Sequence, residues 1–327
     1  MSGARVAVPE ALLLPLAVAW DLLLGEPPTP VHPVVWMGTI ARALERRAPS
    51  AGAGRQFRYG ALLALGPPIA YAILVGGGWR RLRGWPIPAL ALGVPLLKST
   101  FAIRELRRAG AVVRTALEDG DLARARVGLR SLVSRDAAEL SAALVAAAAT
   151  ESLAENLSDA VVAPLCYYAL FGLPGAVAYR AVNTLDALIG YRGRYEWLGK
   201  AAARLDDLLN LLPSRLTAGL IVAAAAVGGE DASRAWATLR RDGGATASPN
   251  AGWPMAAMAG ALGVGLEKVG HYRLGAGGTS ADATTIARAE RLLLLAAGGA
   301  VLLASGARWV LAGRHGQSAR SRDGGAG

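Results

Sequence analysis

Carboxylates and an asparagine gather at the start of an apolar stretch in TESLAENLSDAVVAPL, residues 150–165. On a helix, Glu151, Glu155 and Asp159 recur every four residues and therefore share one face. Ionised groups are unfavourable beside apolar surroundings unless they have a partner or a function. We therefore assign Glu155, Asn156 and Asp159 to a candidate catalytic group.

A second set of carboxylates and amides follows the next apolar window. Helical spacing pairs Asn183 with Asp186, and it pairs Asn210 with both Asp206 and Asp207. Carboxylate and amide oxygens, without Cys or His, are the ligands that Mg²⁺ prefers, and water and substrate phosphate complete its shell. The pattern predicts Mg²⁺ held by Asp206, Asp207 and Asn210, with Asn183 and Asp186 as catalytic residues.

Helix capping and ordinary ion pairing are the structural alternative for each of these pairs. For any single pair this alternative is the more common one, because caps and pairs four residues apart occur in many helices. Three such pairs in one chain, all adjoining apolar windows, favour a functional interpretation.

Two turns carry further polar groups. The segment GEPPTPVHPVVWMG at 25–38 is a proline-rich loop, and TASPNAGWP at 246–254 places a serine before a proline and an asparagine in a turn. Such turns can present backbone N–H groups and a hydroxyl to an anion, although either loop alone fits a structural turn equally well. The candidate substrate-binding residues are His32, Tyr191, Arg192, Arg215, Ser248 and Asn250.

Apolar helices must position these groups. The nine apolar residue types make up 53% of the 327 residues, more than soluble domains usually contain. Uncharged windows at 59–79 and 160–179 are long enough to cross a hydrocarbon core, which needs about 20 residues. Further windows lie at 292–307 and, with weaker signals, at 6–25, 84–97 and 216–229. We predict an all-α polytopic membrane protein with about four to six spans and with polar blocks at one membrane face.

The net charge of +11 comes mainly from arginines between the apolar windows. The positive-inside rule explains that distribution, and no aromatic platform supports nucleic-acid binding. We therefore expect a lipid bilayer as a partner and no nucleic acid. Cys166 is the only cysteine, so an internal disulfide is excluded. We expect residues 1–312 to form a single membrane-embedded catalytic unit and residues 313–327 to form a disordered tail.

The window 160–179 separates the two acidic motifs. If it crossed the bilayer fully, the motifs would face opposite compartments about 30 Å apart. Pro164 and Pro174 interrupt a helix, and Gly172 and Gly175 loosen it further. We therefore predict a broken, re-entrant or interfacial hairpin here. Six residues from the motifs should then converge on one cleft at the cytoplasmic face: Glu155, Asp159, Asn183, Asp186, Asp207 and Asn250.

Five segments occur in the order DLLLGEPPTPVHPVVWMG, ENLSDAVVAPLCYY, YRAVNTLDALIGY, LDDLLNLLPSRLTA and SPNAGWPMAAMAGALGV. Together, over roughly residues 15 to 275, they resemble the CobD/CbiB family of adenosylcobinamide-phosphate synthases. The resemblance implies an integral membrane enzyme of cobalamin biosynthesis. Such an enzyme joins adenosylcobyric acid, a corrinoid, to aminopropanol phosphate or a related amino-alcohol phosphate through an amide bond. ATP is the expected co-substrate, and other cobalamin-pathway enzymes are candidate partners.

Two positions depart from the family pattern. Thr246 stands where many members have a histidine, and Met255 stands where many have a glutamate. Neither side chain can transfer a proton as the family residue would, so both stay outside the proposed site. The chain also has no Gly-rich phosphate-binding motif, so its sequence does not indicate where ATP binds.

The residues alone leave two other functions open. An intramembrane prenyltransferase would use LDDLLN as an acidic Mg²⁺–diphosphate motif, but the chain has only one motif of that form. A transporter would place polar groups on broken helices at the middle of the membrane. Here the polar groups lie mostly in long blocks outside the apolar windows, and no repeated half is evident.

Overall fold

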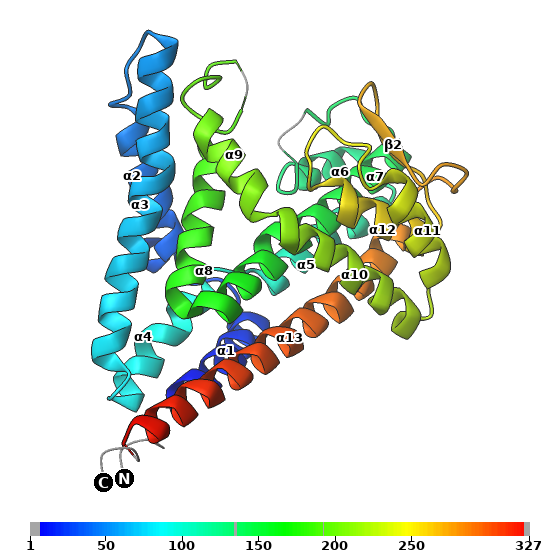
Figure 1. Ribbon diagram of the computed structural model, residues 1–327. Helices are drawn as coiled ribbons and strands as arrows, with labels where there is room; N and C mark the ends of the chain where they lie inside the picture. The colour runs from blue at the N-terminus through cyan, green and yellow to red at the C-terminus, as the bar shows by residue number, and fades with distance from the viewer. Residues whose placement is uncertain (1–6, 134–135, 192, 324–327) are drawn as a thin grey trace. The chain divides into compact units, whose positions relative to one another are not determined.

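The computed structural model describes residues 7–133, 136–191 and 193–323, with the backbone alone for 7–9 and 312–323. Helices make up most of the described chain and strands almost none of it, which confirms the predicted fold class (Figure 1). One short antiparallel hairpin was not predicted. It pairs β1 (Leu266–Lys268) with β2 (Tyr272–Leu274). Strands of three residues are too short to leave a readable alternation in the sequence.

The contacts of the chain group it into two compact units. Unit 1 consists of Met1–Phe101, Pro164–Asp206 and Val301–Gly327, and unit 2 consists of Ala102–Ala163 and Asp207–Ala300. Neither unit is a continuous piece of the chain. The expected single catalytic unit over 1–312 stays a prediction.

Unit 1 takes its helices from the start, the middle and the end of the chain. They are α1 (Ala7–Leu24), the 3-10 turn η1 (Thr29–Val31), α2 (Pro33–Glu45), α3 (Ala53–Leu82), α4 (Pro86–Lys98), most of α8 (Ala163–Ile189), most of α9 (Lys200–Leu209) and the end of α13 (Ala283–Asp323). Small and aliphatic side chains join four of these helices, α2, α3, α8 and α9, in one core. Its members are Ala41, Leu63, Ala64, Leu185, Ile189, Leu198 and Ala202.

An ion pair joins the two ends of unit 1. Arg308 Nη2 donates a hydrogen bond to Glu10 Oε2 at 2.6 Å, and both side chains are mostly buried. The guanidinium also lies over the ring of Tyr168, 5.6 Å from its centroid. A charge in such surroundings requires a partner. The pair therefore fixes α1, α8 and α13 to one another.

Helix α8 is interrupted at Gly172. Its φ of 69° and ψ of −160° lie in a region that is open mainly to glycine. The rings of Tyr167 and Tyr179, on either side of the interruption, stack with their centroids 5.0 Å apart. Gly175 permits this close approach, because a Cβ there would lie 2.5 Å from the carbonyl oxygen of Tyr167. The predicted break in the apolar window is confirmed.

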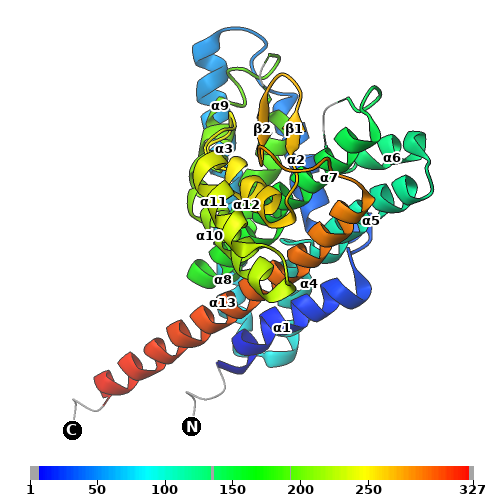
Figure 2. The same ribbon diagram turned by 90° about the vertical axis from the view of Figure 1, so that its right-hand side faces the viewer.

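Unit 2 is a helical bundle centred on α12, a helix that consists mainly of small residues. Its elements are α5 (Ile103–Glu118), α6 (Leu122–Leu129), α7 (Ala142–Leu157), the π-helical turn η2 (Ser158–Val162), α10 (Leu211–Gly228), α11 (Ala232–Asp242), α12 (Gly252–Leu262), the hairpin and the start of α13. Helix α12 packs against α7, α10 and α11, as Figure 2 shows for the last two. A Cβ at Gly260 would lie 2.6 Å from the carbonyl oxygen of Arg234, so glycine allows α11 to approach α12.

Five helical segments among the described residues are long and apolar enough to cross a membrane. They are Ala53–Leu82, Pro86–Glu118, Ala142–Ile189, Leu211–Gly228 and Ala283–Leu311. The number agrees with the predicted range of spans and supports a multi-pass membrane protein. Helix α13 is drawn to Asp323, into the segment expected to be a disordered tail, and that expectation stays a prediction.

Gly60 and Gly66 of α3 provide a matched test of packing in unit 1. A Cβ at Gly60 would lie 1.9 Å from the carbonyl oxygen of Leu198, whereas a Cβ at Gly66 would have no heavy atom within 4 Å. We expect Gly60→Ala to destabilise the protein by about 1–3 kcal/mol through overpacking. Gly66→Ala should be neutral or slightly stabilising, because alanine is the better helix former.

The measurement is the thermal unfolding temperature of each purified variant in detergent. Equal unfolding temperatures for the two variants would contradict the close contact between α3 and the Leu198 carbonyl.

Candidate functional site

The acidic segment of unit 2 departs locally from an α-helix. Helix α7 carries Glu151, which is buried, and Glu155, which is half-buried. Asp159, also half-buried, lies in the π-helical turn η2. Turns of this kind are rare and occur frequently at functional sites. The structure thus places a π-helical turn at the motif that the sequence singled out, a feature that the residue spacing could not reveal.

Asn156 has an internal role in the same segment. Its Nδ2 donates hydrogen bonds to the carbonyl oxygen of Ser152 at 2.9 Å and to the Ser152 hydroxyl at 3.0 Å. The Ser152 hydroxyl donates in turn to the carbonyl oxygen of Leu132 at 2.6 Å. The amide of Asn156 therefore helps to fix α7, and only its Oδ1 remains outside these contacts.

Two of the predicted motifs meet in unit 1. Asn183 Nδ2 on α8 donates a hydrogen bond to Asp206 Oδ1 on α9 at 3.3 Å. Asn183 Oδ1 accepts from Arg180 Nη1 at 3.4 Å. Asp186 lies one turn further along α8 and is half-buried. The pairing of Asn183 with Asp206 joins the YRAVNTLD and LDDLLN motifs, which the sequence treated as separate pairs.

The third polar group lies in unit 2. Asn250 Nδ2 donates to the carbonyl oxygen of Asp207 at 2.7 Å, and Asn250 Oδ1 accepts from Arg215 Nη1 at 2.7 Å. Ser248 forms the predicted turn, because its Oγ accepts from the backbone N–H groups of Asn250 and Ala251. These contacts bring together three of the predicted substrate-binding residues.

The residues predicted to bind Mg²⁺ supply carboxylate and amide oxygens. Among the residues that the structure describes, no group of three or more His, Cys, Asp and Glu side chains could hold a metal. Successive residues on a helix point about 100° apart, so Asp206 and Asp207 present different faces of α9. A carboxylate with neighbouring amide groups suits Mg²⁺ that keeps its waters and substrate phosphates. The assignment of Asp206, Asp207 and Asn210 stays a prediction.

The remaining candidates in this part of the chain lie between α8 and α9. Tyr191 is half-exposed after the end of α8, and Arg192 lies outside the described residues. Arg194 Nη2 contacts Glu45 Oε1 at 3.4 Å, and its guanidinium lies over the ring of Tyr195. The structure thus gives Arg194 an ion pair within unit 1.

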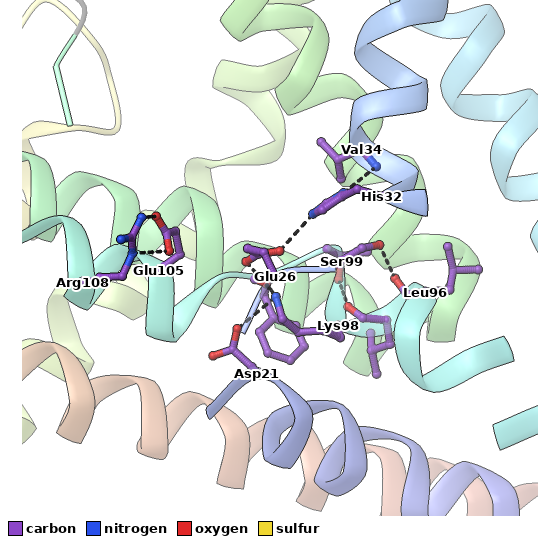
Figure 3. A network of polar contacts seen from close by, with 12 residues as sticks. Asp21, Glu26, His32, Val34, Leu96, Lys98, Ser99, Glu105 and Arg108 are labelled. Carbon is purple, nitrogen blue, oxygen red and sulfur yellow. Dashed lines mark hydrogen bonds and ion pairs between the residues drawn. The ribbon is translucent and has the colours of Figure 1, made fainter. Parts of the chain in front are cut away.

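His32 belongs to a charged network that the sequence did not predict (Figure 3). Its Nε2 lies 2.9 Å from Glu26 Oε2, and its Nδ1 accepts from the backbone N–H of Val34 at the start of α2. The Nδ1 contact requires the neutral tautomer that carries its hydrogen on Nε2. Both ring nitrogens are therefore engaged, and a direct substrate contact by His32 would have to replace one of these bonds.

Lys98 anchors the other side of this network. Its Nζ is fully buried and lies 3.0 Å from Asp21 Oδ1 and 2.7 Å from Glu26 Oε1. It donates hydrogen bonds to that Glu26 oxygen and to the carbonyl oxygen of Phe101 at 3.1 Å. The ammonium is thus held by two carboxylates of opposite charge and one backbone carbonyl. The sequence holds one sign of this network, because Asp21 lies inside the apolar window 6–25 and Lys98 directly follows the window 84–97.

The network predicts a response to acid. Burial opposes ionisation of Glu26, but hydrogen bonds from His32 and Lys98 outweigh it and lower the pKa of this carboxyl below its ordinary value of 4.5. A lowered folded-state pKa means that the ionised group stabilises the fold above the unfolded-state pKa. That contribution is lost as pH falls through the folded-state value.

We expect the unfolding temperature of the purified protein to fall as the pH drops below 4.5, and Glu26→Gln to reduce this fall. Glu105→Gln is the control, because the pair of Glu105 with Arg108 is exposed and contributes little. If the acid response persisted unchanged in Glu26→Gln, it would have to arise from another group.

Comparisons with known proteins agree with this set of motifs. Residues 14–293 match the family described as CobD/Cbib protein. A "Cobalamin biosynthesis protein CobD" of Dehalococcoides mccartyi is 45% identical over 265 residues, which cover 81% of this chain and 86% of the relative. The "Probable cobalamin biosynthesis protein CobD" of Pyrococcus abyssi is 46% identical over 267 residues, covering 80% and 84%.

A further "Cobalamin biosynthesis protein CobD", from Rhodobacter capsulatus, is 43% identical over 264 residues and covers 78% of this chain and 81% of its own length. No solved structure matches this chain. The family match spans most of the sequence and includes all three polar groups described above. The chain therefore belongs to the CobD/CbiB family of cobalamin biosynthesis proteins.

Proposed function

We propose that this protein joins the carboxylate of adenosylcobyric acid to the amine of aminopropanol phosphate, or of a related amino-alcohol phosphate. The product is adenosylcobinamide phosphate. The observation that carries the proposal is membership of the CobD/CbiB family over residues 14–293. The polar groups on its motifs supply chemistry that suits such a reaction.

A carboxylate must gain a good leaving group before an amine can displace one of its oxygens. Transfer of the γ-phosphoryl group of ATP to the carboxylate would form an acyl phosphate and release ADP. The amine would then attack the acyl carbon, lose a proton and expel phosphate. Phosphoryl transfer depends mainly on positioning and on neutralising phosphate charge.

The side chains of the polar groups divide these tasks. When bound, Mg²⁺ would neutralise phosphate charge, and Asp206, Asp207 and Asn210 would hold it with its waters. Arginine would add positive charge beside the phosphates. Glu155 or Asp159 would accept the proton of the attacking amine. Asn156, Asn183 and Asp186 are proposed to orient the reacting groups.

The location of the site follows from the substrates. ATP is available in the cytoplasm, so we propose a protein of the cell membrane with its polar groups at the cytoplasmic face. The corrinoid is large and partly apolar, which suits binding at a membrane interface. Neither a second diphosphate motif nor a repeated half supports the prenyltransferase or transporter alternatives.

The assay that tests the function uses membranes that contain the protein. With adenosylcobyric acid, aminopropanol phosphate, ATP and Mg²⁺, we expect the amide product by mass spectrometry. Asp207→Ala should abolish turnover while the protein stays folded and inserted, and Asp206→Asn should be milder if that residue acts through bound water. Normal turnover of Asp207→Ala at ordinary Mg²⁺ would remove Asp207 from the metal site.

A labelling experiment tests whether the two acidic motifs share a compartment. Single cysteines at Ala160 and Glu196, in a Cys166→Ser background, should react with a membrane-impermeant thiol reagent from the same side of sealed vesicles. Both positions are at least partly exposed and lie outside the proposed catalytic groups. Labelling from opposite sides would contradict a shared site.

A further inference from the structure

Arg215 stands one turn after the start of α10, and its guanidinium is held along one edge. Its Nη1 donates to Asn250 Oδ1 at 2.7 Å, to the Ser214 hydroxyl at 3.0 Å and to the carbonyl oxygen of Leu211 at 3.2 Å. Among the residues that the structure describes, no acceptor contacts its Nε or Nη2. These two nitrogens form the side of the guanidinium that makes paired hydrogen bonds to carboxylate or phosphate.

Trp253 fixes the plane of this guanidinium. The Cζ atom of Arg215 lies 4.5 Å from the centroid of the Trp253 ring. A guanidinium over the face of tryptophan gains both electrostatic attraction and a defined orientation. With Nη1 tied to Asn250 and one face covered by Trp253, the Nε–Nη2 edge has little rotational freedom before any ligand arrives.

Ser248 supplies a second donor, a hydroxyl group next to Asn250 in the same turn. Its Oγ accepts from the backbone N–H groups of Asn250 at 3.2 Å and Ala251 at 3.3 Å. A hydroxyl oxygen has two acceptor positions, so both are taken. What remains is the O–H donor, for which the described residues offer no acceptor. The Thr246 hydroxyl donates to the Ser248 carbonyl at 2.8 Å and holds the turn in place.

Asn250 connects these donors without being available itself. It is 6% exposed, its Nδ2 donates to the carbonyl oxygen of Asp207 and its Oδ1 accepts from Arg215. An amide with both ends occupied inside the protein orients other groups. Its predicted role as a substrate ligand stays a prediction.

We propose that the Nε–Nη2 edge of Arg215 and the hydroxyl of Ser248 form a binding subsite for a phosphate group, and that Asn250 and Trp253 are positioning residues for it. The subsite contains donors only and one fixed positive charge, which is the complement of a phosphate dianion. The phosphate could come from the amino-alcohol phosphate or from ATP. That choice of source rests on the proposed function, whereas phosphate binding itself does not.

The first experiment measures the binding of inorganic phosphate to the purified protein in detergent by calorimetry. Arg215→Lys keeps the charge but loses the paired donors, so we expect about a tenfold weaker Kd. Trp253→Leu should weaken phosphate by a similar factor, whereas Trp253→Phe, which keeps a ring under the guanidinium, should stay within about threefold of the parent. Trp236→Leu is the matched control, since Trp236 is half-exposed on α11 of the same unit.

The unfolding temperature of each variant excludes a simple loss of folding. Unchanged phosphate affinity in both Arg215→Lys and Trp253→Leu would overturn the subsite, and so would equal weakening by Trp236→Leu.

The second experiment identifies the source of the phosphate through turnover. A selective rise in the KM for the amino-alcohol phosphate in Arg215→Lys and Trp253→Leu would assign the subsite to that substrate. A selective rise in the KM for ATP would assign it to the nucleotide, and a rise for the corrinoid alone would overturn the phosphate assignment. If the parent protein forms no amide product but binds phosphate as expected, the proposed function fails and the subsite stands.

Discussion

The buried ammonium of Lys98 needs partners for its charge and its hydrogens, and the local structure at the ends of α1 and α4 follows from that need. Asp21 at the end of α1, Glu26 in the proline-rich loop and the carbonyl oxygen of Phe101 meet it. The C-terminal ends of α1 and α4 both lie beside this cation, which also favours positive charge through their dipoles. Removing one partner would leave an uncompensated charge, so α1, the loop and α4 form a single arrangement.

The same rule applies to two other groups among the described residues. Polar groups beside apolar helices are met inside the protein, by opposite charge in the case of Arg308 and by hydrogen bonds in the case of Asn250. Even the interruption of α8 at Gly172 follows it, because close packing shields the broken backbone. The candidate site groups are thus built from the contacts that stabilise each unit.

The sequence predicted the helical class, the long apolar segments and the break in α8 because hydrophobic length, proline and glycine are local signals. It also located the turn at Ser248, whose proline and serine determine the backbone nearby. It could not predict that Asn183 meets Asp206 or that Trp253 lies under Arg215. Such pairings depend on how distant helices pack. The hydrogen bonds of Asn250 could not be predicted for the same reason, since they depend on burial and on the position of the Asp207 carbonyl.

The ion pair between Glu10 and Arg308 has a consequence for biosynthesis. The two residues stand 298 positions apart, so the ribosome makes Glu10 long before Arg308. During that interval, α1 carries a carboxylate whose cation does not yet exist. The carboxylate gains its guanidinium only when α13 has been made. A chain that stops before residue 308 would keep that carboxylate without its guanidinium, and the cell's proteases would meet a helix that has not been completed.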